Sequence, residues 1–398
     1  MGRSSHREAR LARLGKGIRA VVPRSLRRAI QRIFPLTRLK LAAINAENPL
    51  STVTEGTPTK EDVGASESDP TVGIIRNQMA FHTRFVKACR EAGCSFRVLN
   101  LASEAWLAEV RESGVDFVLV WPDAVTTDRA KVVKDRCDLI ERALHIPVYP
   151  TRPERWMYED KVRLADWLMA HNVPHPRTWV FFDREEAHDF AKSCALPVVF
   201  KLPFGAGSTG VRIVRSRRRL KRIVRRAFGR GHSSSGHDPR DRQRGSILLQ
   251  EYLPGIQEWR LVRIGSSYFG HPKGRRGEFH SGSGRVEWTP PTSRHLDFLH
   301  HVTEVGGFRS MAVDVFETSD GRLLVNELQT VFGASTSVHQ LMVDGEPGRM
   351  VRSKEAGWEF EPGEFARNAC ANERLKDTLE RFRDRSGPKC KLATASDA

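Results

Sequence analysis

The sequence predicts an α/β domain with a parallel sheet, followed by a domain in which strands dominate. Between residues 71 and 150, short apolar segments alternate with segments of helical periodicity, which is typical of strand–helix–strand units. Further along, period-two apolar runs flank glycine-rich and Asp-Gly turns, which indicates hairpins. With 398 residues, 39% of them hydrophobic, the chain can bury two or three cores.

The first domain begins near Thr71. Its expected strands are TVGIIR, SFRVLNL, DFVLVW and IPVYP, with a helix after each of the first three. In the second domain, apolar residues at helical spacing predict a helix over 159–172, which Pro174 ends. The later elements expected are the strand RTWVFF, a short helix, strands to about Val286, a helix over 294–305, a hairpin over 311–329 and a helix over about 364–384.

Residues 1–45 are predicted to form a basic amphipathic extension. The first 40 residues contain twelve Lys or Arg and one acid, Glu8, and so carry most of the net charge of +17. Apolar residues recur among the arginines at helical steps, with a break at Pro23. Such a segment is attracted to anionic lipid, nucleic acid or an acidic polymer, and a solvated mobile arm explains it equally well.

Two tracts of low complexity are predicted to lack structure. Residues 46–70 are rich in Ser, Thr, Gly, Pro and acids, which predicts a disordered linker. Residues 232–245 (HSSSGHDPRDRQRG) predict a mobile loop inside the second domain. The six cysteines form no C-x-x-C pair and no apolar run reaches the length of about 20 residues that spans a bilayer, so a cytoplasmic protein is expected.

The segment VVFKLPFGAGSTG (198–210) predicts a hairpin that can close over an anion. In a P-loop the lysine follows the last glycine, whereas Lys201 precedes Gly205, Gly207 and Gly210. A dinucleotide-binding fingerprint opens a helix, but Gly210 leads into the strand-like VRIVRS. The remaining interpretation is a glycine loop between two strands, with backbone N–H groups and Lys201 free to contact phosphate, although a simple tight turn would look the same.

The hairpin MAVDVFETSDGRLLVNELQ supplies a second candidate site. If Asp320 and Gly321 form a two-residue turn, Ser319 pairs with Arg322 and Asp314 lies opposite Glu327. Gln329 then projects from the same face as Glu327. Oxygen ligands of this kind suit Mg²⁺ held together with substrate phosphates, while a solvent-facing pair of acids is the alternative interpretation.

Together these features make the chain resemble ATP-grasp enzymes of the carboxylate–amine ligase type. The resemblance extends from about Thr71 to Val343 and includes the motifs YEDKVRLADWL, GAGSTG, LLQEYLPGIQEWRLVRIG and the hairpin acids, in the family's order. It implies an α/β pre-ATP-grasp domain over 71–150 and an α+β ATP-grasp domain of two subdomains over 151–345. A C-terminal helix and tail would occupy 346–398.

The resemblance also implies which part of ATP, or which metal ion, each residue would bind. Lys161, Lys201 and the loop residues Gly205, Gly207, Ser208, Thr209 and Gly210 would bind the phosphates of ATP. Gln250, Glu251, Tyr252 and Leu253 would bind adenine, and Glu258 the ribose. Asp314, Glu327 and Gln329 would hold one or two Mg²⁺ ions, with Mn²⁺ also acceptable, although the family usually has Asn where Gln329 stands.

The segment HPKGRRGEFHSGSGR (271–285) resembles ATP-grasp proteins of bacterial polysaccharide clusters. Arg260, Lys273, Arg275, Arg276 and His280 would then face the phosphates or an anionic substrate, with Arg260, Lys273 and Arg276 assisting catalysis. The expected reaction activates a carboxylate, with a sugar acid or glycan as one candidate substrate, as an acyl phosphate and couples it to an amine. A kinase that phosphorylates a hydroxyl is the alternative within the same fold.

A third interpretation is a protein that binds an anionic polymer. Residues 212–230 carry ten Lys or Arg and no acid. Leu220, Ile223, Val224 and Phe228 fit the buried stripe of a helix in this segment, and stacking aromatics are missing, so nucleic acid is disfavoured. Peripheral contact with the inner membrane surface through residues 1–40 stays open, and the sequence does not predict an oligomeric state.

Overall fold

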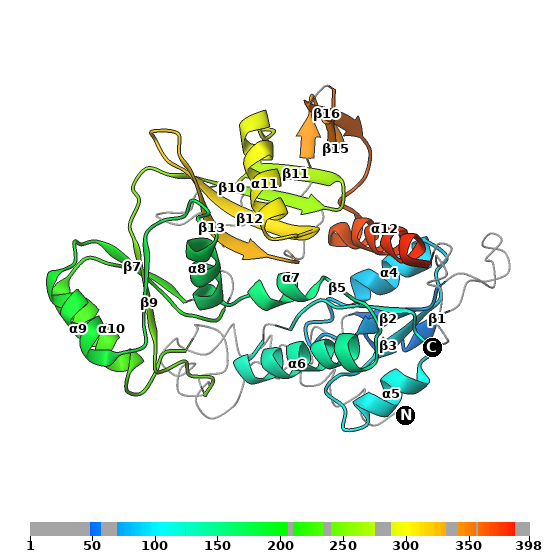
Figure 1. Cartoon of the computed structure of the whole chain (residues 1–398), viewed down its shortest axis with the longest axis horizontal. Helices are drawn as coiled ribbons and strands as arrows, with labels where there is room; N and C mark the ends of the chain where they lie inside the picture. Colours follow the sequence, from blue (N-terminus) through cyan, green and yellow to red (C-terminus); the bar gives the residue numbers. More distant parts are fainter. Residues whose placement is uncertain are drawn as a thin grey trace, which may run out of the picture.

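The described part of the chain folds around three β-sheets in the computed structural model (Figure 1). The structure describes residues 48–56, 70–123, 125–205, 210–233, 240–274, 288–331, 341–355 and 357–386. The predicted extension over 1–45 lies outside these residues. No helix among the described residues has both the length and the apolar character needed to cross a membrane.

The first sheet belongs to the N-terminal α/β domain and has the strand order β1-β3-β2-β4-β5. Strands β2, β3, β4 and β5 run parallel, as predicted from the alternating pattern. Helices α4 and α12 cover one face, and α5 and α6 cover the other. The elements are β2 (Val72–Ile75), α4 (Thr83–Glu91), β3 (Phe96–Leu99), α5 (Trp106–Glu112), β4 (Phe117–Leu119), α6 (Thr127–Ala143) and β5 (Val148–Tyr149).

Part of the predicted linker is structured. Residues 48–56 form the 3₁₀ helix η1 (Pro49–Thr52) and the strand β1 (Glu55–Gly56), which pairs antiparallel with β3. Asn48 caps η1 by accepting a hydrogen bond from the backbone N–H of Leu50 at 3.1 Å. The prediction of a linker is therefore wrong for residues 48–56, because edge pairing supplies the contacts that their composition does not indicate.

His82, at the start of α4, is expected to make the fold sensitive to mild acid. The side chain is 1% exposed, and its Nδ1 accepts a hydrogen bond from the backbone N–H of Asn77 at 3.2 Å. Burial, assisted by the charge of Arg76, lowers the pKa of His82 from 6.5 to about 4. The unfolded chain therefore takes up this proton at a higher pH than the folded chain, and stability is lost as the pH falls from 6.5 towards 4.

A single linked proton corresponds to a slope of about 1.4 kcal/mol per pH unit. Urea unfolding of the wild type and of His82→Gln at pH 7 and pH 5.5 measures the contribution of this histidine. The variant is expected to lose less free energy of unfolding between the two pH values. An equal loss in both proteins would show that His82 does not contribute.

The second sheet forms the small subdomain of the second domain, with the antiparallel order β6-β9-β7-β8. Helices α9 and α10 pack against it through one apolar cluster, at the end of the molecule away from the first sheet (Figure 1). Leu220, Ile223 and Val224 of α10 are buried, as the sequence predicts. The elements are β6 (Thr178–Phe181), α9 (Arg184–Ser193), β7 (Val198–Lys201), β8 (Val211–Val214), α10 (Arg217–Ala227) and β9 (Ile247–Glu251).

The ends of the predicted 232–245 loop are ordered. His232 pairs with Gln243 in an isolated bridge, and the Gln243 amide exchanges two hydrogen bonds of 2.7 Å with the backbone of Phe204. Asp241 accepts hydrogen bonds from the N–H and the hydroxyl of Thr127 at the start of α6. The small subdomain is thereby connected to the N-terminal domain. Residues 240–245 form no helix or strand apart from the bridge at Gln243, as the loop prediction has it.

The third sheet forms the large subdomain, with the order β13-β12-β10-β11-β15-β14 and β16 paired to β15. Helices α8 and α11 pack on one of its faces through a single apolar cluster. The other face packs against the start of α12. The elements are α8 (Lys161–Ala170), β10 (Gln257–Ile264), β11 (Ser267–Pro272), α11 (Ser293–Val305), β12 (Ser310–Glu317), β13 (Leu323–Gln329), β14 (Leu341–Val343), β15 (Glu346–Ser353), β16 (Gly357–Pro362) and α12 (Arg367–Ser386).

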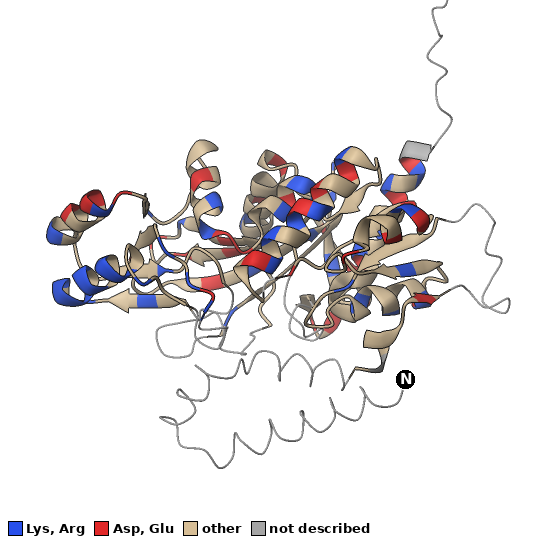
Figure 2. Ribbon diagram, turned by 90° about the horizontal axis from the view of Figure 1, so that it is seen from below, with Lys and Arg blue, Asp and Glu red and all other residues tan. Residues whose placement is uncertain are grey.

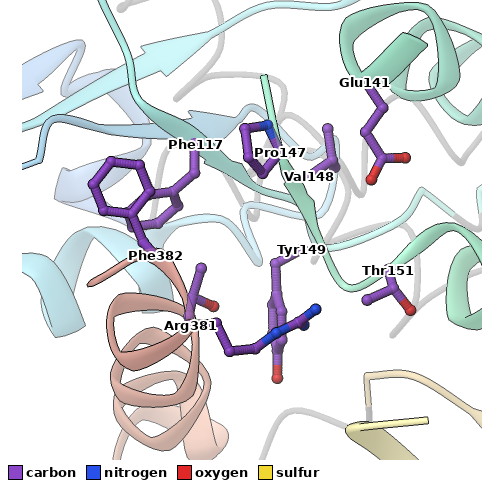
Figure 3. A pocket seen from close by; sticks show the side chains of 9 residues that line it. Phe117, Glu141, Pro147, Val148, Tyr149, Thr151, Arg381 and Phe382 are labelled. Carbon is purple, nitrogen blue, oxygen red and sulfur yellow. The ribbon is translucent and has the colours of Figure 1, made fainter. Parts of the chain in front are cut away.

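The C-terminal region differs from the prediction of a helix and tail after residue 345. Residues 346–362 form β15 and β16, which extend the large sheet. The helix α12 then crosses to the N-terminal domain and packs beside α4 (Figure 1). Its Phe382 ring lies 5.7 Å from that of Phe117, next to a small pocket of about 70 Å³ (Figure 3). This pocket contains none of the predicted site residues.

Helix α7 (Arg152–Met157) is fixed to the large subdomain through Glu154. The carboxylate of Glu154 is fully buried and accepts hydrogen bonds from four donors. One oxygen accepts from the backbone N–H groups of Arg309 (2.6 Å) and Ser310 (2.5 Å), at the start of β12. The other accepts from the N–H and hydroxyl of Thr151, completing a capping box. The strand that carries Asp314 is therefore fixed to the chain that leads into α8.

Candidate active site

The β12–β13 hairpin brings Asp314 and Glu327 directly opposite each other, as predicted. The turn differs from the prediction, because Thr318 pairs with Arg322 and the loop contains three residues rather than two. Gly321 adopts a φ of 82°, which suits the last residue of such a loop. A β-bulge then shifts the register by one residue, since Val315 pairs with Val325 while Asp314 pairs with Glu327. Asn326 is the extra residue.

Two lysines from outside the hairpin meet the bulge. Lys201, at the end of β7, donates a hydrogen bond from Nζ to Oδ1 of Asn326 at 2.7 Å. Lys161, at the start of α8, lies with Nζ 3.4 Å from Oε1 of Glu327 and also donates to the carbonyl oxygen of Gly205 at 2.5 Å. The structure thus brings Lys161, Lys201, Gly205 and Glu327 together as the sequence predicted, and adds Asn326.

The two lysines differ in their electrostatics. Burial lowers the pKa of Lys201 to about 8, and the neighbouring charge of Lys161 adds to this effect. Burial acts in the same direction on Lys161, but Glu327 and Glu159 outweigh it and raise the pKa of Lys161 above 10.5. An anion placed between the two ammonium groups would relieve their mutual repulsion.

Asp314 accepts hydrogen bonds from two cations. Arg260 forms a bidentate pair with it, at 2.8 Å and 2.9 Å. Lys273 donates to Asp314 and also to Oε1 of Glu258, at 2.6 Å in the latter contact. Burial alone would raise the pKa of Asp314, but Arg260 and Lys273 hold it well below 3.8. Arg260, Lys273, Glu258 and Asp314 therefore form one network, in which Lys273 directly follows β11 and the other three residues lie on β10 and β12.

Glu159 is a site residue that the sequence interpretation missed. It precedes α8 with a φ of 57°, is 4% exposed, and accepts a hydrogen bond on Oε1 from the Nε2 of Gln329 at 3.2 Å. Its other oxygen is buried with no hydrogen-bond partner in the described part of the chain. Burial raises the pKa of Glu159 to about 7, with the charge of Glu327 adding to the rise.

The glycine hairpin has the predicted strand–loop–strand form. Lys201 pairs with Val211, so β7 and β8 are antiparallel on either side of the loop. Gly210 lies against Leu202, and a Cβ there would come within 2.8 Å of that side chain. Gly207, Ser208 and Thr209 lie outside the described residues, so their predicted contact with phosphate stays a prediction.

The predicted adenine-binding residues lie at the end of β9, where the chain passes from the small to the large subdomain. Gln250 donates to the hydroxyl of Thr178 at 3.0 Å, and Glu251 accepts a hydrogen bond from the backbone N–H of Arg177 at 2.6 Å. Tyr252 lies beside the Arg215 guanidinium, and Leu253 follows it in the linking segment. Their role, like that of Glu258 in binding ribose, stays a prediction. Arg275, Arg276 and His280 lie outside the described residues.

The donor set fits a magnesium ion that is shared with phosphates. Asp314, Glu327 and Gln329 supply two carboxylates and an amide, which matches the one or two protein carboxylates typical of Mg²⁺ bound with a nucleotide. Over the described ranges, no group of three or more His, Cys, Asp or Glu side chains could hold a metal ion by itself. The protein groups therefore suit an ion that arrives with its phosphate ligands.

Comparison with known proteins agrees with this geometry. The family whose model matches is the ATP binding domain of the carbamoyl-phosphate synthase L chain, over residues 160–259. The D-alanine–D-alanine ligase of Bacillus anthracis is similar in structure, with a TM-score of 0.54 at 14% identity, over 80% of this chain and 100% of the ligase. Its complex with ATP gives a TM-score of 0.51 at 14% identity, with the same coverage.

N5-carboxyaminoimidazole ribonucleotide synthetase, in its ADP complex, gives a TM-score of 0.50 at 12% identity, over 84% of this chain and 99% of that protein. Comparison with the curated proteins gives no match. The chain has the ATP-grasp fold, and the recognition of that fold from the sequence is confirmed, since residues 160–259 match the family model and the whole fold is shared with these enzymes. The prediction of ATP as the nucleotide is confirmed by the family model.

Proposed function

We propose that this protein is an ATP- and Mg²⁺-dependent ligase that activates a carboxylate as an acyl phosphate and couples it to an amine. The observation that carries the proposal is the convergence of Lys161, Lys201, Asp314 and Glu327 from four separate elements, α8, β7, β12 and β13. Two ammonium groups facing two carboxylates suit a nucleotide triphosphate bound with a divalent cation. The ligase class is that of the D-alanine–D-alanine ligase whose fold the chain shares.

The residues have separable roles in this reaction. Lys161 and Lys201 bind the phosphates. Asp314, Glu327 and Gln329 would hold magnesium, which supplies charge neutralisation at the terminal phosphates when it is bound. The bidentate pair with Asp314 keeps the Arg260 guanidinium in a fixed orientation beside the position where negative charge develops.

The reaction has a direct test. Phosphate release is measured with Mg-ATP and pooled carboxylates and amines, including uronic acids, because the basic segment around Lys273 suits an acidic sugar. Release that requires both a carboxylate and an amine supports the ligase. Hydroxylamine added in place of the amine would trap an acyl phosphate as a hydroxamate. Phosphorylation of a hydroxyl without hydroxamate would instead assign the kinase reaction.

A second candidate function is binding of an anionic polymer through α10. The solvent-facing side of this helix is strongly basic, with no acidic residue in the helix (Figure 2). Four of its exposed arginines make no hydrogen bond or ion pair within the described part of the chain: Arg218, Arg219, Arg222 and Arg225. Burial and the nearby charges of Arg226 and Arg219 lower the pKa of Arg212, a sign of crowded positive charge. Arginine suits polymers that carry carboxylates because it pairs with them bidentately.

The triple variant Arg218→Glu, Arg222→Glu and Arg225→Glu is expected to weaken binding of polyglucuronate by about tenfold or more at low salt. Fluorescence anisotropy with a labelled polymer, measured at several salt concentrations, provides the readout. Arg111→Glu, Lys131→Glu and Arg142→Glu on the N-terminal domain form a matched control with the same change in charge. Equal loss in both variants would assign the binding to net charge alone rather than to α10.

A further inference from the structure

Asn326 connects the two subdomains at the phosphate end of the candidate site. Its Oδ1 accepts a hydrogen bond from Nζ of Lys201 across a sequence separation of 125 residues. Lys201 belongs to the small sheet and is 8% exposed, whereas Asn326 belongs to the large sheet. The contact therefore determines where the Lys201 ammonium lies relative to the hairpin that carries Glu327.

The bulge explains how two adjacent residues of one strand can serve two lysines. In a regular strand, successive side chains point to opposite faces, so a residue next to Glu327 would be directed away from it. The extra residue at the bulge changes this, and Asn326 contacts Lys201 while Glu327 lies beside Lys161. Bulges that redirect a side chain in this way occur frequently beside active sites.

The contact of Lys201 with Asn326 differs from that of Lys161 with Glu327, because the first partner is an amide and the second is a carboxylate. A carboxylate would neutralise the ammonium that it holds, whereas the amide oxygen of Asn326 accepts a hydrogen bond and leaves the positive charge in place. We propose that Asn326 is a positioning residue, which orients the Lys201 ammonium towards the phosphates of ATP without neutralising it. This inference rests on the proposed function, because it assigns phosphate as the ligand of Lys201.

A purely structural role predicts a different response to substitution. If Asn326 served only to join the subdomains, Asn326→Asp would keep the contact as an ion pair of the same size, and nucleotide binding would be unchanged or stronger. If the residue must preserve the charge of Lys201, the same substitution would weaken nucleotide binding although the contact persists. Asn326→Asp therefore separates the two roles, while Asn326→Ala removes the contact altogether.

The test measures binding of a non-hydrolysable ATP analogue with Mg²⁺ by calorimetry, so that no turnover is needed. Asn326→Asp is expected to weaken binding about tenfold or more, and Asn326→Ala by about tenfold. The KM for ATP should rise in parallel, with little change in the KM for the carboxylate.

Asn100→Asp is the matched control for charge, because the Oδ1 of Asn100 accepts a backbone hydrogen bond in the N-terminal domain. Asn372→Ala is the control for loss of an asparagine side chain that joins two elements, because Asn372 donates to Glu91 of α4 and accepts from Asn368 of α12.

The outcomes distinguish failure of the positioning role of Asn326 from failure of the proposed ATP-dependent function. Wild-type affinity in Asn326→Asp would overturn the positioning role and leave the ATP-dependent function intact. Failure of the wild type itself to bind the analogue would overturn both. Should Asn326→Ala unfold, the isosteric Asn326→Asp still decides, because it keeps the size and the contact of the original side chain. Loss of affinity in Asn100→Asp equal to that in Asn326→Asp would also overturn the inference.

Discussion

Glu327→Gln is expected to lower Mg-ATP-dependent phosphate release by about 10³-fold, the order expected when a group that stabilises transferred phosphate is lost. Glu327 lies opposite Asp314 and 3.4 Å from Lys161, so its charge serves both the cation and the lysine. The amide keeps the shape of the side chain but removes this charge. Steady-state measurement of phosphate release, with the substrates that give the highest wild-type rate, provides the value.

Glu317→Gln is the matched control on the same hairpin. Its carboxylate accepts a hydrogen bond from Nε1 of Trp259 at 2.9 Å and lies towards α11, outside the candidate site. The amide oxygen can keep that contact, so activity should stay within about twofold of the wild type. If Glu327→Gln retained more than a tenth of the wild-type rate, Glu327 would not be a ligand of the nucleotide-bound cation.

Glu154→Ala is expected to lower the free energy of unfolding by about 3–5 kcal/mol, the largest effect on stability expected from one substitution outside the site. The change removes an acceptor from two backbone N–H groups at the start of β12 and from the capping box of α7. The N–H of Ser310 cannot reach water, because Glu154 and Ser310 are fully buried, and Arg309 and Thr151 are half-buried. Urea unfolding followed by circular dichroism measures the change.

Glu55→Ala is the control that tests whether removing any glutamate carboxylate lowers the free energy of unfolding as much as Glu154→Ala does. Glu55 forms an ion pair with Arg97 at the exposed edge of the first sheet, with 67% of its side chain accessible. Removing it should change the free energy of unfolding by less than about 1 kcal/mol. A similar small change in Glu154→Ala would mean that the β12 amides find other acceptors.

The sequence predicts the pairing of Asp314 with Glu327 correctly but for a partly wrong reason. The predicted two-residue turn at Asp320 and Gly321 is in fact a three-residue loop, and the bulge at Asn326 restores the expected register. The longer loop and the bulge each shift the pairing register by one residue, in opposite directions. Asp314 therefore still pairs with Glu327. They do not cancel at Asn326, because the period-two pattern assigns it to the face opposite Glu327. Its contact with Lys201 therefore has no signal in the sequence.

The elements that follow local rules are predicted well. The four parallel strands of the first sheet and helix α8 lie where the apolar patterns indicate them. In α8, Asp160 caps the helix by accepting from the backbone N–H groups of Val162 and Arg163, which places Lys161 at the first turn. Glu159 and its acidic neighbour Asp160 lie directly before Lys161 in the YEDK motif. This pair of acids is the signal that could have indicated a role for Glu159.

The elements that depend on distant partners are missed. Strand β1 forms by pairing with the edge of β3, and β15 and β16 form by extending the large sheet, although their own sequences are polar and mixed. Helix α12 is predicted correctly as a helix, but its position against α4 depends on an apolar stripe that could have packed on either domain. Tertiary contacts decide these cases, and local composition does not.

The most direct test of the central claim is calorimetric titration of the wild-type protein with ATP, first with excess Mg²⁺ and then with EDTA. One site contains Lys161, Lys201, Asp314 and Glu327, so nucleotide and cation are expected to bind together. Binding at one site per chain with Mg²⁺, and an affinity at least about tenfold weaker in EDTA, is the expected result. Absence of ATP binding, or binding of equal strength without a divalent cation, would contradict it.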